Sequence, residues 1–238
     1  LSIFCLIAER IKPWRNQNLF RKNWDQDLFW AIFNIYLFSI IYTQIIKRLD
    51  NAPITLFNFL HLNTIENFFN LNQYSILTQI LIGIIIKDFV EWLIHNLLHR
   101  IGFLWRIHQL HHSIKTMDWI GNTRFHFMEI LVYKFFKYLP LIFFNISFEA
   151  LLIIAVFSTL IGHLNHSNLN ISWGPLKYIF NSPAMHIWHH DKINHLKNGQ
   201  NFGIVFSIWD WVFQTAYMPK GQPEELGFQG EEKYPADI

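Results

Sequence analysis

Ten of the 13 histidines in the chain fall into three groups whose spacing suits metal binding. These residues are His95, His99, His108, His111 and His112; His163 and His166; and His186, His189 and His190. Spacings of three and four residues place side chains on one face of a helix, and neutral imidazole is a ligand for many transition metals. The pattern His-x2-His-His occurs twice, so chance is a poor explanation. We therefore predict a histidine-rich metal site.

The number of histidines predicts two metal ions. One ion binds about four to six protein ligands, whereas this set offers more. Imidazoles with carboxylates nearby suit iron, zinc, copper or nickel rather than calcium or magnesium, and spacing does not choose among these metals. His166 ranks above His163 because it begins a polar turn. His126 and His195 are left unassigned, and His61 is expected on the surface.

The composition is typical of an integral membrane protein. Hydrophobic residues make up 52% of the chain, which contains 24 Phe and 10 Trp. The net charge of +2 and the lack of a strongly basic face predict no nucleic-acid partner. The single cysteine, Cys5, excludes an internal disulfide and therefore a disulfide-stabilised scaffold.

Apolar segments and their flanking charges predict the topology. Residues 9–27 form the densest basic stretch beside an apolar segment, which predicts a cytoplasmic location. Residues 28–46 are long enough to cross the bilayer outward, and residues 76–98 are expected to return. The polar residues 49–74 between them are then an external loop. The first histidine group therefore lies at the cytosolic face.

Two shorter apolar segments follow, at residues 128–144 and 148–161. They form either two complete crossings or a re-entrant hairpin. Both arrangements return the chain to the cytosolic side, beside the first histidines. We predict an all-α, polytopic membrane fold with about four spans, or two spans plus a hairpin, and a cytosolic helical cap that carries a histidine-rich dimetal site.

The whole chain, residues 1–238, is expected to be one membrane domain. Its parts are an N-terminal basic segment at 1–27, membrane helices with the first histidine clusters at 28–166, a cytosolic cap at 167–218, and an exposed tail at 219–238. The first residue is Leu rather than Met, so we expect an incomplete N-terminus.

Three charged residues interrupt the segment at 76–98. Intramembrane ionisable groups usually face a helix bundle and mark function, so Lys87, Asp88 and Glu91 are candidates. Alternatively, Lys87 and Glu91 form an ion pair at i, i+4 and do no more. Asp88 shares a helical face with His95 and His99, which favours a role at the site.

Motifs spread over residues 85–215 resemble the fatty acid hydroxylase/sterol desaturase superfamily. The matching elements are Asp88, His95-x3-His99-Arg100, Leu104-Trp105, His108-x2-His111-His112-Ser113, Arg124-Phe125-His126 with Glu129, His166-Ser167-Asn168, Pro183, His186-x2-His189-His190, Asn201-x-Gly203 and Trp209-Asp210. Two departures, Phe202 in place of Tyr and Gln214 in place of Gly, lie outside the histidine set and bear on the subfamily.

The resemblance implies a histidine cage with two iron ions on the cytosolic side of a bacterial inner membrane or the endoplasmic reticulum. Zinc could occupy such a site in a purified protein. The implied activity is O2-dependent hydroxylation or desaturation of a lipid, with electrons from an external reductase, cytochrome or pterin. Asp88, Asn201 and Asp210 are expected to fix imidazole tautomers, or, for Asn201 and Asp210, to form caps or turns. Arg124 and Glu129 are expected to be structural.

Two other classes of function stay open. A membrane zinc hydrolase needs about three or four ligands and a positioned carboxylate base, and the sequence lacks His-Glu-x-x-His. A non-catalytic membrane metal-binding protein, such as a carrier, is the other alternative, although carriers usually have more spans with charged pathways.

Overall fold

The computed structural model describes residues 2–37, 39–40 and 70–234 of the 238-residue chain. These residues form helices and connecting loops. Their only β-structure consists of isolated bridges, at Phe180–Phe206, Asp191–Leu226 and Lys197–Gly199. The all-α fold class predicted from the sequence is therefore confirmed for the described part of the chain.

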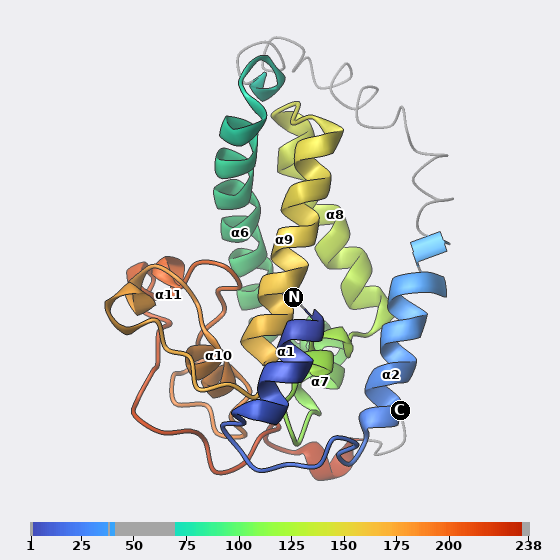
Figure 1. Cartoon of the computed structure of the whole chain (residues 1–238), viewed down its shortest axis with the longest axis vertical. Coiled ribbons are helices and arrows are strands. Elements are labelled where there is room, and N and C mark those ends of the chain that lie inside the picture. Colours follow the sequence, from blue (N-terminus) through green and yellow to red (C-terminus); the bar gives the residue numbers. More distant parts are fainter. Residues whose placement is uncertain (1, 38, 41–69, 235–238) are drawn as a thin grey trace.

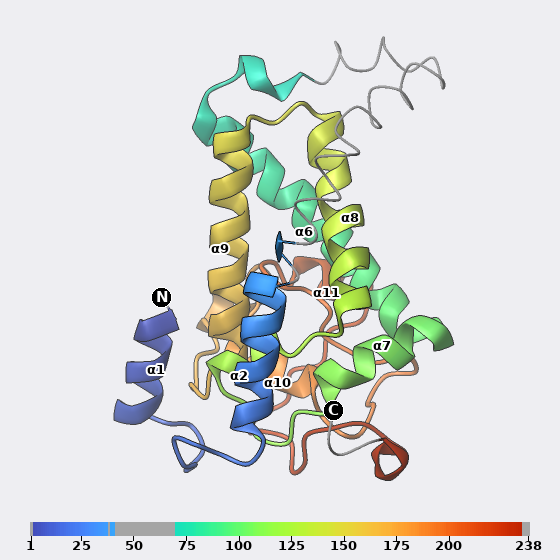
Figure 2. The ribbon, with the colours of Figure 1, turned by 90° about the vertical axis from the view of Figure 1, so that its right-hand side faces the viewer.

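Three long helices form the upper part of the molecule and stand side by side (Figures 1 and 2). They are α6 (Ile76–Arg100), α8 (Phe127–Phe143) and α9 (Phe148–His166). Leu141, Ala150 and Ile154 have no exposed surface and form the centre of an apolar core between these helices. Gly83 lets α9 approach α6, because a β-carbon there would lie 2.5 Å from Ile154 Cδ1.

Side-chain caps fix where the long helices begin. The Ser75 hydroxyl accepts a hydrogen bond from Thr78 N at the start of α6. The Ser147 hydroxyl does the same for Ala150 N at the start of α9. Such caps satisfy backbone N–H groups that have no partner within the helix. The histidines that end α6 and α9 thereby take a fixed place at the lower end of the bundle.

The described residues contain one helix that is long and apolar enough to cross a membrane, α9. Helix α6 has 25 residues, but Lys87, Asp88 and Glu91 lie within it. Helix α8 has 17 residues, fewer than the roughly 20 that a straight span needs. The segment predicted as the first span, residues 28–46, extends beyond the described residues. The number and direction of spans therefore stay predictions.

The lower part of the molecule is built from short helices and loops (Figure 1). These elements are α1 (Ser2–Ile11), α2 (Trp24–Ile32) with a π-turn (Phe33–Leu37), α7 (Gly102–His112), α10 (Pro183–His189), α11 (Ile208–Val212), and single 3-10 turns at Leu71–Gln73, Trp119–Thr123, Gly174–Tyr178 and Glu231–Lys233. Helix α7 follows α6 after the single residue Ile101. Helix α10 packs against α9. The helices α6, α7, α9 and α10 thus place their histidines together at the lower end of the bundle.

Within the described residues 219–234, the structure differs in part from the exposed tail that we predicted for residues 219–238. Leu226 and Phe228 are buried, and Leu226 packs with Met117, Ile187 and Trp188. Backbone N–H of Gly227 donates to the His190 carbonyl. The composition of this segment is mostly polar, so the sequence did not indicate that Leu226 and Phe228 are buried. Their burial holds the segment against the cap.

Candidate metal centre

Nine of the ten candidate histidines lie in two groups at the lower ends of α6 and α9. One group contains His95, His99, His108, His112 and His189; the other contains His111, His166, His186 and His190. Within each group, one ring nitrogen of every histidine lies within 4.8 Å of the others. The structure therefore brings together side chains separated by up to about 95 residues, in an arrangement with room for two ions.

Each copy of the His-x2-His-His pattern supplies histidines to both groups. In α7, His108 and His112 are four residues apart and share a face, whereas His111 points toward the other group. In the second copy, at the end of α10, one histidine joins the five-histidine group and two join the other group. His189 joins the five-histidine group, and His186 and His190 join the four-histidine group.

Ring nitrogens in both groups fit a metal-binding role. Nitrogens without a hydrogen-bond partner are buried at His99 Nε2, His112 Nε2, His189 Nε2, His186 Nδ1, and both nitrogens of His190. Buried polar atoms normally have a partner, so this concentration indicates a site built for a bound group. Imidazole nitrogens also suit transition metals.

Distances between ring nitrogens support the same interpretation. The Nε2 atoms of His95 and His108 lie 3.2 Å apart. The Nε2 atom of His166 lies 3.2 Å from that of His111 and also 3.2 Å from that of His186. Two nitrogens that bind one ion at about 2.1 Å are separated by about 3.0–3.4 Å at octahedral to tetrahedral angles. The donor atoms are therefore already spaced for shared coordination.

Burial keeps these imidazoles neutral. It lowers the pKa of His108, His111 and His112 well below the usual value, and the neighbouring histidine rings lower it further. The same causes lower the pKa of His186 and His190. A neutral imidazole offers a lone pair to a metal, so no proton has to leave these rings before an ion binds.

Five rings are oriented by an acceptor at Nδ1. The pairs are His95 with the Phe202 carbonyl at 2.9 Å, His108 with Glu129 Oε1 at 2.7 Å, His111 with the Arg124 carbonyl at 3.2 Å, His166 with the Gly162 carbonyl at 2.9 Å, and His189 with the Gln200 carbonyl at 2.7 Å. A carbonyl or carboxylate can only accept, so Nδ1 carries the proton. The lone pair on Nε2 then faces the group, as in outer-shell support of metal ligands.

Glu129 has a role that the sequence analysis missed. We expected a structural residue, whereas its fully buried carboxylate accepts from His108 Nδ1. Sequence spacing gave little signal, because Glu129 and His108 lie on different helices and are 21 residues apart. Its place beside Arg124-Phe125-His126 in the quoted motif was the one available clue.

Replacing Glu129 with leucine is expected to lower metal affinity about 10- to 100-fold, because His108 loses the group that fixes its tautomer. Glu129→Gln should lose less, since the amide oxygen still accepts from Nδ1. A chelator-competition titration measures both values. Glu149→Leu, an exposed glutamate in the first turn of α9, is the control. Equal affinity for Glu129→Leu and the control would contradict this role.

Asp88 and Asp210 contact the loop beside the histidines rather than the rings. Asp88 accepts from Val205 N and Phe206 N, and Asp210 accepts from Phe202 N and Gly203 N at 2.8 Å. Burial raises the pKa of Asp210 to about 6, against the effect of its hydrogen bonds. Both carboxylates thus hold the loop whose Phe202 carbonyl orients His95.

Asn201 ties this loop to the end of the cap. Its amide donates to the carbonyls of Met185 and Tyr217, and its oxygen accepts from Tyr217 N. The described contacts therefore give Asn201 a positioning role one step away from the imidazoles. Its left-handed φ of 57° suits Asn better than most other residues.

The other histidines lie outside both groups. His163 is buried and packs edge-on against Trp119, with ring centroids 5.5 Å apart. The His126 ring accepts from Met128 N and caps α8. His195 pairs with Asp191 and stacks on Tyr217. His61 lies outside the described residues. The preference for His166 over His163 agrees with this placement.

A cavity of about 400 Å³ opens onto both histidine groups. It lies between α6, α8, α9 and the π-turn that follows α2, and His95, His108, His111 and His166 line it. A second, more polar pocket of about 260 Å³ reaches His99, His112 and His189 from the cap side. The histidine groups are therefore approached from two directions.

Residues 80–215 match the family model described as fatty acid hydroxylase. The chain belongs to this family. The match includes all ten candidate histidines and Glu129, so the family resemblance inferred from the motifs is confirmed. No solved structure matches the chain.

Several curated proteins are similar to this member of the fatty acid hydroxylase family. An ornithine lipid hydroxylase, OlsE, from Rhizobium tropici is 34% identical over 163 residues, which are 67% of this chain and 48% of that protein. An alkylglycerol monooxygenase from Caenorhabditis elegans is 30% identical over 129 residues, or 54% of this chain and 25% of that protein. The human alkylglycerol monooxygenase is 30% identical over 128 residues, which are 54% of this chain and 28% of that protein. The chain spans about half or less of these relatives.

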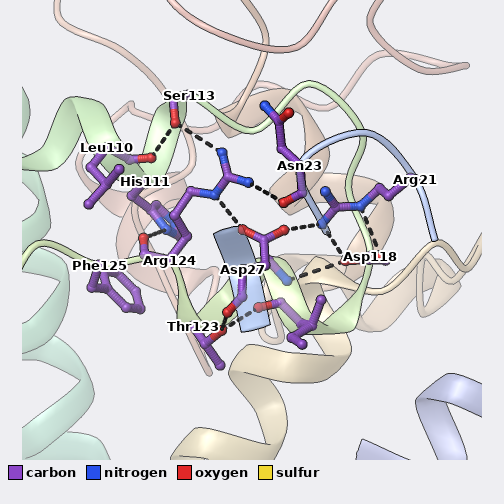
Figure 3. Close-up of polar contacts among 12 residues, drawn as sticks. Arg21, Asn23, Asp27, Leu110, His111, Ser113, Asp118, Thr123, Arg124 and Phe125 are labelled. Atoms are coloured by element: carbon purple, nitrogen blue, oxygen red, sulfur yellow. Dashed lines mark hydrogen bonds and ion pairs between the residues drawn. The ribbon is translucent and has the colours of Figure 1, made fainter. Parts of the chain in front are cut away.

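A buried ion network connects the N-terminal segment, outside the family match, to the histidines (Figure 3). Asp27 of α2 pairs with Arg21 and with Arg124, and Arg21 also pairs with Asp118. All four side chains are buried. The backbone carbonyl of Arg124 accepts from His111 Nδ1 at 3.2 Å. The network therefore fixes the backbone that orients one ring of the four-histidine group.

Replacing Asp27 with alanine is expected to lower the free energy of unfolding by about 3–5 kcal/mol, because two buried guanidinium groups lose their shared partner. Denaturant titration in detergent measures the change. Asp25→Ala, at an exposed position in the same helix, should change it by less than about 1 kcal/mol. Similar losses for the two variants would show that the network contributes no special stability.

Proposed function

We propose that this protein is an O2-dependent oxygenase that hydroxylates or desaturates a C–H bond of a membrane lipid, with one iron ion in each histidine group. The observation that carries the proposal is the cavity of about 400 Å³ that is lined by histidines of both groups. An organic substrate there would lie next to both sites. Membership in the fatty acid hydroxylase family supports the same class of reaction.

The chemistry requires an external source of electrons. Hydroxylation converts C–H, O2, two electrons and two protons into C–OH and water. Desaturation removes hydrogen from two adjacent carbons and converts the same oxidant and electrons into two molecules of water. Iron bound by the imidazoles supplies activation of O2. We propose that a reductase, a cytochrome or a pterin delivers these electrons.

The chain's own residues prepare the site for this reaction. Burial keeps the rings neutral, and the acceptors at Nδ1 direct Nε2 lone pairs toward each group. Nearly all of the histidine side chains in the two groups are buried, so solvent reaches them through the two cavities. The polar pocket on the cap side gives the electron donor a surface close to His99, His112 and His189.

A lipid substrate and a membrane location are part of the proposal. The named relatives are an ornithine lipid hydroxylase and alkylglycerol monooxygenases, so we propose a polar membrane lipid. Helix α9 is long and apolar enough to cross a bilayer. We propose that the histidine groups and the cap lie on the cytosolic side, and that residues 1–238 act as one membrane domain.

A zinc hydrolase fits the site less well. Such an enzyme uses about three or four ligands and a carboxylate base beside an activated water. Here nine imidazoles lie in two groups, and the carboxylate of Glu129 is hydrogen-bonded to one of them, His108.

Lipidomics of cells with and without the protein, grown with and without O2, tests the proposal. We expect a lipid that is 16 Da heavier, or 2 Da lighter, than its precursor, and that appears only when both the protein and O2 are present. An O2-independent change in the lipid profile would overturn it.

A further inference from the structure

The cavity beside the histidines contains buried charged residues that the oxygenase chemistry does not use. Lys87 and Glu91 of α6 form an ion pair. Lys137 of α8 joins them, with Nζ 2.9 Å from Glu91 Oε1. Lys87 has no exposed surface and Glu91 is 6% exposed. All three residues line the cavity, so its wall includes charged groups as well as apolar ones.

Two ammonium groups share one carboxylate at the wall of this cavity. Lys87 and Lys137 both line the cavity, and both pair with Glu91. One oxygen of Glu91 is engaged by Lys87 and the other by Lys137. Glu91 therefore has no oxygen left for a further N–H group of either lysine, and a ligand with negative charge could accept from such a group.

Lys137 is the residue best placed to bind that ligand. Its ammonium group lies 5.5 Å from the ring centres of Tyr133 and Tyr138, and its side chain is 18% exposed. An ammonium group has three N–H donors, and the hydrogen bond to Glu91 uses one of them. The two tyrosine rings hold the group in place, and donors remain for an anion.

The position of the lysines fixes how far the anion lies from the histidines. Glu91 precedes His95 by one helical turn, which is about 6 Å along the axis. His95 lines the same cavity. A negative group at Lys137 would therefore place atoms that are a few bonds away beside the five-histidine group.

We propose that the cavity binds the anionic part of a lipid, a carboxylate or a phosphate, at Lys137 and Lys87. The C–H bond presented to the histidines then lies near the polar end of the lipid, not in the middle of an acyl chain. The inference that this bond is the one oxidised rests on the proposed function. The anion site does not depend on that function.

The test measures lipid binding by the full, metal-loaded chain in detergent without O2. Two matched pairs of probes are used: palmitate against hexadecanol, and phosphatidate against diacylglycerol with the same chains. The first pair reports a carboxylate site and the second a phosphate site. We expect the anionic probe of at least one pair to bind about tenfold more tightly or better.

Substitutions at Lys137 test whether this residue causes the preference for the anionic probe. Lys137→Met should remove it while binding of the neutral probe persists, and Lys137→Arg should keep it. Lys12→Met, which removes the same charge from an exposed position outside the cavity, should behave as the unaltered protein. Persistent binding of the neutral probe shows that Lys137→Met is folded.

Equal affinity of the unaltered protein for both members of both pairs would overturn the proposal. An equal loss of anionic and neutral binding in Lys137→Met would do the same. Because binding is measured without turnover, failure of the lipid-oxidation experiment would leave this binding difference intact, and the two proposals fail separately.

Discussion

His189→Ala is expected to lose one of two bound iron ions, and His166→Ala the other, and each variant should oxidise lipid more than about 100-fold more slowly. Loss of an outer hydrogen-bond partner typically costs about 10- to 100-fold in metal affinity or activity, so loss of a ligand should cost more. His189 belongs to the five-histidine group and His166 to the four-histidine group. Metal analysis of the purified variants and product quantification measure the two effects.

A control histidine in the cap separates this effect from general damage. His195 lies outside both groups and pairs with Asp191. His195→Gln retains a hydrogen-bonding side chain, so it should keep two ions and nearly full activity. Full metal content and full activity in His189→Ala would contradict the assignment of His189 as a ligand.

Removal of metal is expected to have the second large effect. Several buried ring nitrogens have no partner within the protein, and a bound ion satisfies them. A ligand present at about 1,000 times its dissociation constant stabilises a fold by about 4 kcal/mol. The metal-free protein should therefore unfold at a lower temperature than the iron-loaded protein and should not oxidise lipid. Thermal unfolding in detergent, together with product analysis, checks both.

Adding different metals back to the metal-free protein distinguishes the structural role of the metal from its redox role. Ferrous iron should restore both stability and lipid oxidation to the metal-free protein. Zinc binds the same donors but has no redox chemistry, so it should restore stability alone. A zinc-loaded protein that transforms lipid without O2 would instead support the hydrolase interpretation.

The histidine pattern named the nine side chains that the structure gathers into two groups, because part of this arrangement depends on local geometry. Residues three and four apart on a helix share a face, and the apolar segments placed the three groups at one end of the bundle. The sequence could not divide the rings between two groups. That division depends on how α7 and α10 are rotated against α6 and α9, which tertiary packing decides.

Supporting residues were harder to predict because their contacts are distant in sequence. Asp27 meets Arg124 across 97 positions, and its charge looks like that of any residue in a basic segment. Glu129 resembled a structural residue until its carboxylate was placed against His108. Lys87 and Glu91 form the ion pair that their spacing indicated, but only the fold shows Lys137 beside them.

Purified, iron-loaded protein supplied with an electron donor, a lipid extract and 18O2 tests the central claim most directly. The account predicts O2 consumption together with a lipid product that carries one 18O atom, or a desaturated product that lacks two hydrogens. A product that forms equally under argon, or that takes its oxygen from water, would contradict it.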